Sequence, residues 1–200
     1  TDIIAHLYER YLTNTKEVEV TDRLIEALIL TMVHEGPRVI EDPNNYEARA
    51  NIMWAGMMAH NNSCGVGRTQ DWTSHNVEHE LSALYDCAHG AGLAVAMPAV
   101  FTYTLHHDVM RFAKIAVRVW GCQMDFDDPE RTAKEGIEAL RRFLISIGMP
   151  KNFEELGAKE EDIEFLAHTA CYGTENADGK LYGFTTLDQK DVEAIYKLMV

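Results

Sequence analysis

Helical periodicity dominates the pattern of apolar and polar positions along this chain. From Asp2 to Leu12, apolar side chains recur three or four positions apart, which places them on one face of an α-helix. The same spacing predicts further helices over Thr21–Gly36, Pro43–His60, Trp72–Leu84, a segment from His89 onward, Asp108–Trp120, Asp128–Ile147, Glu160–Cys171 and Leu187–Met199. We therefore expect an all-α fold, a helical bundle.

Prolines, glycines and capping residues mark the expected ends of these helices. Thr21 suits the N-cap of the second helix, Gly36–Pro37 predicts its interruption, and Pro98 predicts a disturbance of the helix after His89. The segments 61–71 and 172–185 are rich in glycine and small polar residues, which is typical of loops. No segment alternates between apolar and polar residues as a strand would.

The composition fits a single domain over residues 1–200, because 46% of the residues are apolar and can form one substantial core. The formal net charge of −14 argues against nucleic acids and anionic membranes as partners, since both would repel the protein. No apolar stretch approaches the ~20 residues that span a bilayer. The four cysteines are scattered without a CxxC motif, which indicates reduced thiols in a cytoplasmic protein.

The candidate chemistry lies in metal-binding side chains at helical spacing. Asp2 and His6 are four residues apart, and so are His75 and His79. A separation of four puts two side chains on one face of a helix, one turn apart, so that both can reach one ion. A carboxylate with imidazoles suits a catalytic divalent transition metal that keeps an open position. The spacing alone equally allows surface or hydrogen-bonded core histidines.

His89 can join this set only if the chain turns. It follows His75 by fourteen residues, which is roughly 21 Å in an unbroken helix and too far for two ligands of one ion. The segment Asp86–Gly90 could provide the break. A shared metal site therefore predicts that the helix carrying His75 ends before His89.

Other patterns allow different functions. The run from His79 is not the zinc-protease motif HExxH, because Ala83 occupies the position of the second histidine. The doublet His107–Asp108 raises a metal-dependent phosphohydrolase of the HD type, although Asp108 also suits the N-cap of the following helix. A non-catalytic helical interaction domain is the third possibility.

Two further groups of residues are interpreted as structural. His34 and His60 lie near predicted helix ends and are assigned no role. Met53, Met57 and Met58 form a stripe at helical spacing, which favours a place in the core over a cofactor pocket.

Three segments resemble the iron-containing (group III) alcohol dehydrogenases, most closely their butanol dehydrogenase and broad aldehyde reductase branch. Thr1–His6, His75–Ala83 and Ala88–Gly90 match that family's Thr-Asp-x-x-x-His, His-x-x-x-His-Glu-Leu and His-Gly patterns. Their order, the fourteen-residue separation and the flanking Gln70–Trp72 make the match specific. The resemblance covers the whole chain and implies the helical C-terminal domain of the dehydroquinate-synthase-like fold.

The resemblance also implies roles for the site residues. Asp2, His6, His75 and His89 would be the ligands of Fe²⁺ or Zn²⁺. His79 would lie beside the metal and the nicotinamide without being a ligand. As the catalytic and cofactor-contacting residue, it would orient the substrate or relay a proton.

The activity that the resemblance implies is the NAD(P)-dependent interconversion of primary alcohols, such as butanol, and aldehydes. The metal would polarise the substrate oxygen during hydride transfer. The family's N-terminal α/β domain, which binds most of the NAD(P)H, is missing from these 200 residues, so the chain alone is expected to be inactive. The full-length protein is expected to be a cytoplasmic homodimer acting on a small alcohol or aldehyde.

Overall fold

A computed structural model describes residues 1–173 and 178–200, and the regular structure in these ranges is helical apart from one short hairpin. Its elements are α1 (Asp2–Tyr11), α2 (Glu19–Glu41), α3 (Tyr46–His60), α4 (Thr73–Tyr85), α5 (His89–Thr104), α6 (Val109–Trp120), α7 (Pro129–Ser146), α8 (Phe153–Leu156), α9 (Ile163–Tyr172), β1 (Lys180–Tyr182), β2 (Thr186–Asp188) and α10 (Gln189–Lys197). The expected all-α class is confirmed. Short 3₁₀ turns precede α6 and α9.

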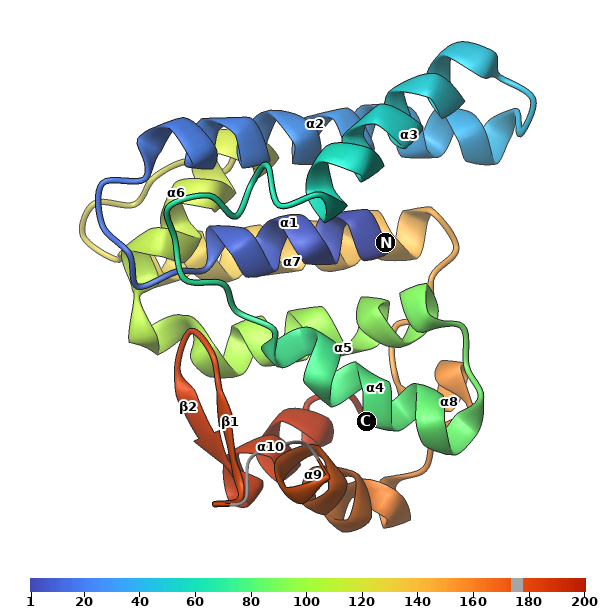
Figure 1. Ribbon diagram of the computed structural model, residues 1–200, viewed down its shortest axis with the longest axis vertical. Coiled ribbons are helices and arrows are strands. Elements are labelled where there is room, and N and C mark those ends of the chain that lie inside the picture. Colours follow the sequence, from blue (N-terminus) through green and yellow to red (C-terminus); the bar gives the residue numbers. More distant parts are fainter. Residues whose placement is uncertain (174–177) are drawn as a thin grey trace.

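α1 lies at the centre of the fold. It contacts α2 and α3 on one side and α4 and α5 on the other (Figure 1). Ile4, Leu7 and Tyr11 are fully buried, as the periodicity predicts. The same helix also buries Glu9 and Arg10, and charged side chains are almost never buried in this way unless they are paired.

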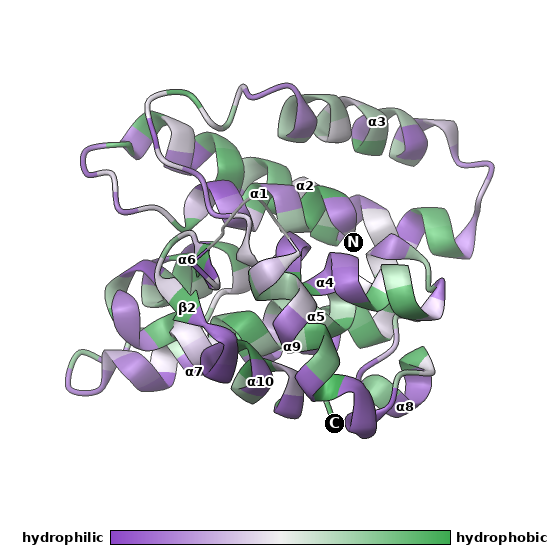
Figure 2. Ribbon diagram, turned by 60° about the horizontal axis from the view of Figure 1, so that its bottom comes forward, coloured by the Kyte–Doolittle hydropathy of each residue, from purple (hydrophilic) through white to green (hydrophobic). Residues whose placement is uncertain are grey.

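The buried apolar side chains form one cluster around α1 and α5. Every residue of α5 from Gly92 to Phe101 is buried, which is typical of a core helix. The surrounding helices carry both hydrophobic and hydrophilic residues (Figure 2). The core therefore holds α1, α4 and α5 in fixed positions relative to one another.

Both predicted boundaries of the second helix are wrong, and each has a local cause. α2 begins at Glu19 instead of Thr21, whose hydroxyl donates back to the Val18 carbonyl inside the first turn at 3.1 Å. α2 also continues through Gly36–Pro37, because the glycine lacks the Cβ that would collide with the proline ring. α5 likewise continues through Pro98.

The hairpin β1–β2 corrects the expectation that the chain has no strand. Its register pairs Leu181 with Leu187, and each strand has only three residues, too few for an alternating pattern to stand out in the sequence. The predicted loop 172–185 thus contains β1, while its residues 174–177 lie outside the described residues. The last helix starts at Gln189, because Asp188 forms a capping box with Asp191.

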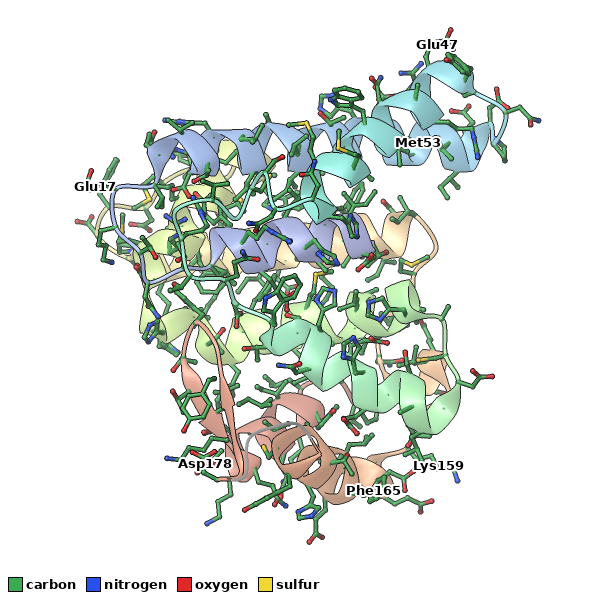
Figure 3. The ribbon with its side chains drawn as sticks, in the orientation of Figure 1. Glu17, Glu47, Met53, Lys159, Phe165 and Asp178 are labelled. Atoms are coloured by element: carbon green, nitrogen blue, oxygen red, sulfur yellow. The ribbon has the colours of Figure 1, made fainter. Side chains whose placement is uncertain are left out.

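The methionine stripe on α3 is only partly a core feature. Met58 packs against the core, but Met53 is 73% exposed and Met57 is 44% exposed. Figure 3 shows Met53 on the part of α3 that extends away from the body of the molecule, towards Glu47. The assignment of the whole stripe to the core is therefore wrong.

None of the described helices combines the length and the apolar character that a membrane crossing requires.

A buried ion-pair network joins α2 to α6 and to the loop before α4. Asp22 Oδ1 accepts a hydrogen bond from Arg68 Nη2 at 2.8 Å, and Asp22 Oδ2 accepts one from Arg111 Nη1 at 2.8 Å. Burial would raise the pKa of Asp22, but the hydrogen bonds from Arg111 and Arg68 outweigh it and hold that pKa below its usual value. The ionised carboxylate therefore stabilises the fold.

The substitution Asp22→Asn should lower the free energy of unfolding at pH 7 by about 3–5 kcal/mol, because it leaves buried guanidinium groups without their counter-charge. Urea denaturation measures this loss. The difference from the parent chain should shrink as the pH falls below about 3.9, the usual pKa of an aspartate, and through the lower folded-state pKa of Asp22.

The control for this experiment is Glu138→Gln, which removes an exposed ion pair with Arg141. It should change the free energy of unfolding by less than about 1 kcal/mol. Equal losses in the two variants would contradict a special role for the buried network.

Candidate metal centre

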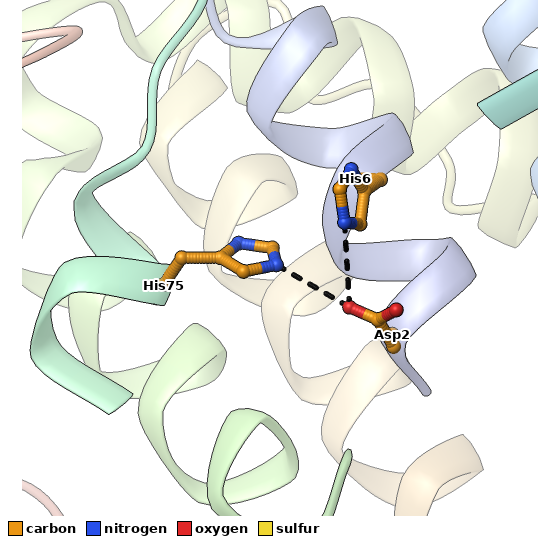
Figure 4. Close-up of side chains that lie close together, drawn as sticks. All are labelled: Asp2, His6 and His75. Atoms are coloured by element: carbon orange, nitrogen blue, oxygen red, sulfur yellow. Dashed lines mark hydrogen bonds and ion pairs between the residues drawn. The ribbon is translucent and has the colours of Figure 1, made fainter. Parts of the chain in front are cut away.

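Three of the predicted site residues converge on one carboxylate oxygen of a fourth, Asp2. Asp2 Oδ1 lies 3.3 Å from His75 Nε2, 3.5 Å from His6 Nε2 and 3.5 Å from His89 Nε2. Figure 4 shows Asp2 and His6 on successive turns of α1, with His75 reaching them from α4. Side chains from two turns of α1, from α4 and from the start of α5 thus meet at one point.

The chain turns between His75 and His89 as the shared site requires. α4 ends at Tyr85, and Asp86 takes the left-handed conformation with φ 50°. His89 is the first residue of α5, and its ring centroid lies 5.3 Å from that of His75. The break predicted within 86–90 is confirmed.

Glu9 fixes the position of His75. Its side chain has no exposed surface, and its Oε1 accepts a hydrogen bond from the His75 backbone N–H at 3.0 Å. Glu9 Oε2 pairs with His75 Nδ1. One carboxylate therefore holds both the backbone and the ring of His75 and directs Nε2 towards Asp2.

The two charges of this pair affect each other. Burial raises the pKa of Glu9 to about 7. Burial would lower the pKa of His75, but its hydrogen bonds to Asp2 and Glu9 outweigh that effect and raise it to about 9. Asp2 shows the opposite shift: burial would raise its pKa, and hydrogen bonds from His75 and His60 bring it below the usual value.

Glu78 fixes His89 in a similar way. Its side chain is fully buried, its Oε2 pairs with His89 Nδ1, and its Oε1 accepts a hydrogen bond from the Ser82 hydroxyl. Gly92 makes room for this carboxylate, because a Cβ at that position would lie 2.3 Å from Glu78 Oε1. The close approach of α5 to α4 thus depends on a glycine.

Asp71 anchors the start of α4 beside α1. Its backbone N–H donates to the Glu9 carbonyl at 2.8 Å. Its Oδ1 accepts hydrogen bonds from the Thr73 hydroxyl at 2.6 Å and the Phe184 backbone N–H at 3.1 Å. Gly183 is also required here, because a Cβ would lie 2.1 Å from Asp71 Oδ1. The segment before α4 therefore positions His75 from its N-terminal side.

His6 differs from the other two histidines in its hydrogen bonding. Arg10 Nη1 lies 3.1 Å from His6 Nδ1 and donates to the His6 carbonyl at 3.0 Å. A guanidinium only donates, so Nδ1 accepts and the proton of the neutral ring is on Nε2. Burial lowers the pKa of His6 to about 4, which keeps this ring neutral.

His79 lies one turn after His75 on α4, at the exposed edge of the cluster. Its ring centroid is 5.9 Å from that of His75 and 5.5 Å from that of His89. Burial of part of the ring lowers its pKa, which favours the neutral form. The ring therefore borders the convergent atoms from the solvent side.

The donor set fits a divalent transition metal. His75 and His89 each pair through Nδ1 with a buried carboxylate, while Nε2 faces the Asp2 carboxylate. A neutral imidazole that keeps its proton on Nδ1 leaves the lone pair of Nε2 free to bind an ion. Two ligands that are each about 2.1 Å from an ion lie roughly 3.0–3.4 Å apart, close to the distances found around Asp2.

The carboxylates of Glu9 and Glu78 are the site residues that the sequence analysis missed. Both lie on ligand helices: Glu9 follows His6 by three residues, and Glu78 follows His75 by three residues. The sequence therefore shows a carboxylate three residues after each of these two histidines. It does not show which histidine each carboxylate contacts, because Glu9 pairs with His75 and Glu78 pairs with His89.

The alternative pair His107–Asp108 has other partners. Asp108 caps α6 by accepting a hydrogen bond from the Arg111 backbone N–H at 3.1 Å. His107 Nε2 lies 2.8 Å from Asn14 Oδ1. Among the described residues, neither belongs to a group of three side chains spaced to hold an ion.

The chain is similar over its full length to proteins of a known family. Residues 1–200 match the family model described as "Fe-containing alcohol dehydrogenase family, C-terminal". The chain is 34% identical over 197 residues to NADH-dependent butanol dehydrogenase A of Clostridium acetobutylicum. This match covers 98% of this chain and 50% of that protein. It is 33% identical over 165 residues to the NADPH-dependent aldehyde reductase YqhD of Escherichia coli, covering 82% and 42%.

A solved structure resembles the whole fold. The crystal structure of NADH-dependent butanol dehydrogenase A from Thermotoga maritima superposes with a TM-score of 0.92 at 33% identity, covering 99% of this chain and 50% of that one. The chain therefore spans about half the length of the relatives that it matches.

The substitution Gly92→Ala should lower the free energy of unfolding by about 1–3 kcal/mol, because the new methyl group collides with the buried Glu78 carboxylate. Chemical denaturation measures the change. The matched control is Gly90→Ala on the same helix, whose Cβ would meet only the Thr1 Cβ at 3.6 Å. The control should be neutral or slightly stabilising, and an equally tolerant Gly92→Ala variant would refute the close-packing argument.

Proposed function

The chain belongs to the Fe-containing alcohol dehydrogenase family, and from this premise we propose that it is the metal-binding catalytic domain of an NAD(P)-dependent alcohol dehydrogenase. Residues 1–200 would form this one domain, and a further α/β domain of the full-length protein would bind most of the NAD(P)H. The proposed reaction converts a primary alcohol and NAD(P)⁺ into an aldehyde, NAD(P)H and a proton, and the reverse.

The observation that carries the proposal is the convergence of three imidazole Nε2 atoms on one oxygen of Asp2. We assign Asp2, His6, His75 and His89 as the ligands of Fe²⁺ or Zn²⁺. Binding through His6 Nε2 requires the Arg10 contact at Nδ1 to be released, because the neutral ring must then keep its proton on Nδ1. Glu9 and Glu78 hold His75 and His89 in the required orientation without such a change.

The chemistry needs two groups that this chain would only help to position. The bound metal supplies a Lewis acid for the substrate oxygen, and the nicotinamide supplies or accepts the hydride. The residues of this chain orient the site: Asp2 provides negative charge at its centre, and the buried carboxylates Glu9 and Glu78 keep the histidine rings from rotating.

His79 is the proposed proton carrier. Its ring is exposed beside His75 and His89, and it is not among the atoms that converge on Asp2. A neutral ring at this position can accept the alcohol proton from the substrate side and release it to solvent, or donate it in the reverse direction. The same position would place it beside the nicotinamide.

The relatives suggest the class of substrate. Their names describe an NADH-dependent butanol dehydrogenase and an NADPH-dependent aldehyde reductase, so we propose a small primary alcohol or aldehyde as substrate. We also propose that the full-length protein is a cytoplasmic homodimer. The HD phosphohydrolase and the non-catalytic interaction domain have no comparable observation in their favour, since His107 and Asp108 have structural partners.

The ligand assignment predicts that His75→Ala and His89→Ala in the full-length enzyme each lose tightly bound metal and at least about 100-fold in kcat/KM. Elemental analysis and steady-state kinetics with butanol or butyraldehyde measure the two effects. His34→Ala is the control, because it removes an exposed histidine on α2. Full activity with stoichiometric metal in either test variant would disprove the assignment.

The proton-carrier role predicts a different result for His79→Ala. This variant should keep its metal, while kcat falls by about 100-fold because proton transfer loses its carrier. Metal content and kcat are measured on the same preparation. Loss of the metal together with activity would instead make His79 a ligand, and an unchanged kcat would remove it from the mechanism.

A further inference from the structure

The helix α3 is apolar on two faces. Its inner face lies beside α1 and α2, and it carries buried or half-buried residues spaced four, three and four positions apart: Ala48, Ile52, Ala55 and Ala59. Its outer face has the same spacing but is exposed to solvent, and we call its four residues the outer stripe: Tyr46, Ala50, Met53 and Met57. A helix that is apolar on all sides normally lies inside a protein, so the outer stripe is a candidate contact surface.

The outer stripe and its neighbours have the composition of a protein interface. Tyr46 is 76% exposed, Met53 is 73% exposed, and Trp54 beside the stripe is 67% exposed. A groove of about 950 Å³ follows these side chains and is also lined by Arg49. Single exposed apolar residues are ordinary, but aromatic residues, methionine and arginine gathered in one patch are typical of interface cores.

The spacing of the outer stripe suits another helix. Positions four, three and four apart form the a/d seam along which two helices pair side by side. The small side chain of Ala50 allows a close approach near the middle of this seam. α3 is also preformed, because it packs on α1 and α2 and because Asn45 caps it by accepting a hydrogen bond from the Ala48 backbone N–H at 3.0 Å. Pairing therefore needs little further ordering of the backbone.

The residues on either side of the outer stripe complement each other between two copies of the chain. Arg49 and Trp54 lie on opposite sides of the stripe, since five residues turn a helix through about 140°. Arg49 donates to the Pro43 carbonyl at 3.2 Å and has no ion pair among the residues described by the structure. In a parallel helix pair, the side positions that meet are five residues apart, so Arg49 of one copy lies over the partner's Trp54. A two-fold axis creates this contact twice.

Charge does not oppose this contact locally. The protein as a whole has a net charge of −14, which disfavours the association of two copies. Between Tyr46 and His60, however, Glu47 is balanced by Arg49, and there is no further Asp, Glu, Lys or Arg. The outer face of α3 is therefore close to neutral.

We propose that the outer stripe is an interface between two copies of this chain, whose α3 helices pair in parallel about a two-fold axis; the proposal rests on the proposed homodimer. Tyr46, Met53 and Met57 form the seam, and each Arg49 lies over the partner's Trp54. The exposed parts of Tyr46 and Trp54 alone offer roughly 300 Å² of surface. With the methionines and Arg49, this patch supplies more than half of the ~800 Å² that each partner contributes to a standard interface.

The first test is Met53→Glu in the full-length protein, which places two carboxylates opposite each other in the seam. The dissociation constant of the dimer should rise at least about 100-fold, because the charges repel and lose their water. Sedimentation of fluorescently labelled protein from nanomolar concentrations upward measures it. The matched control is Met110→Glu, the same change at a methionine of α6 that is 54% exposed, and it should match the parent.

The second test is Met53→Cys, which examines the direction of pairing. In a parallel pair, position 53 of one copy faces position 53 of the other, so mild oxidation should join the two chains through a disulfide. In an antiparallel pair, position 53 faces position 50 instead. Non-reducing electrophoresis detects the joined chains. The parent, with its four native cysteines, and Met110→Cys should both remain single chains.

The outcomes separate this proposal from the rest of the proposed function. A dimeric parent with an unchanged dissociation constant in Met53→Glu refutes the interface but leaves the homodimer standing. Dissociation of Met53→Glu without a disulfide in Met53→Cys refutes the parallel pairing. A parent that is monomeric at all concentrations refutes both the interface and the homodimer, and weaker NAD(P)H binding by Met53→Glu would then show that the α/β domain covers the stripe. Metal content and turnover of the parent test the catalytic proposal separately.

Discussion

Glu9 is a carboxylate without any exposed surface, and the arrangement of the site depends on how its two oxygens are satisfied. Both are satisfied by a single residue, because His75 donates its backbone N–H to one oxygen and pairs its ring with the other. A buried carboxylate that lost these partners would be strongly destabilised. The central helix and α4 are therefore held in one relative position, and the direction of the His75 ring follows from it.

The same constraint recurs where α4 meets α5. Glu78 is buried as completely as Glu9, and it needs both the Ser82 hydroxyl and the His89 ring to satisfy its oxygens. Gly92 allows the helices to approach closely enough for this contact. The orientation of His75 and His89 in the candidate site thus follows from the way buried charges are satisfied between helices.

The sequence predicts the parts of this structure that depend on local spacing. The helices and the grouping of Asp2 with His6 follow from periodicities of three to four residues. The turn before His89 follows from its distance to His75, which an unbroken helix would make too long for a shared ion. The contacts of Glu9, Glu78 and His60 do not, because their partners lie 66, 11 and 58 residues away. The hairpin was missed because three-residue strands are too short to show a period. Non-local pairing of polar groups is what the sequence alone leaves undetermined.

The left-handed turn at Asp86 has a consequence for how this chain can change during evolution. Loops usually tolerate insertions and deletions. This turn joins two helices whose positions are fixed by the same carboxylate, since Glu78 precedes it and holds His89 immediately after it. A longer or shorter connection would move His89 away from Glu78. Variation in length should therefore accumulate elsewhere, as in the α2–α3 connection at 42–45, which Figure 1 shows at an outer corner of the molecule.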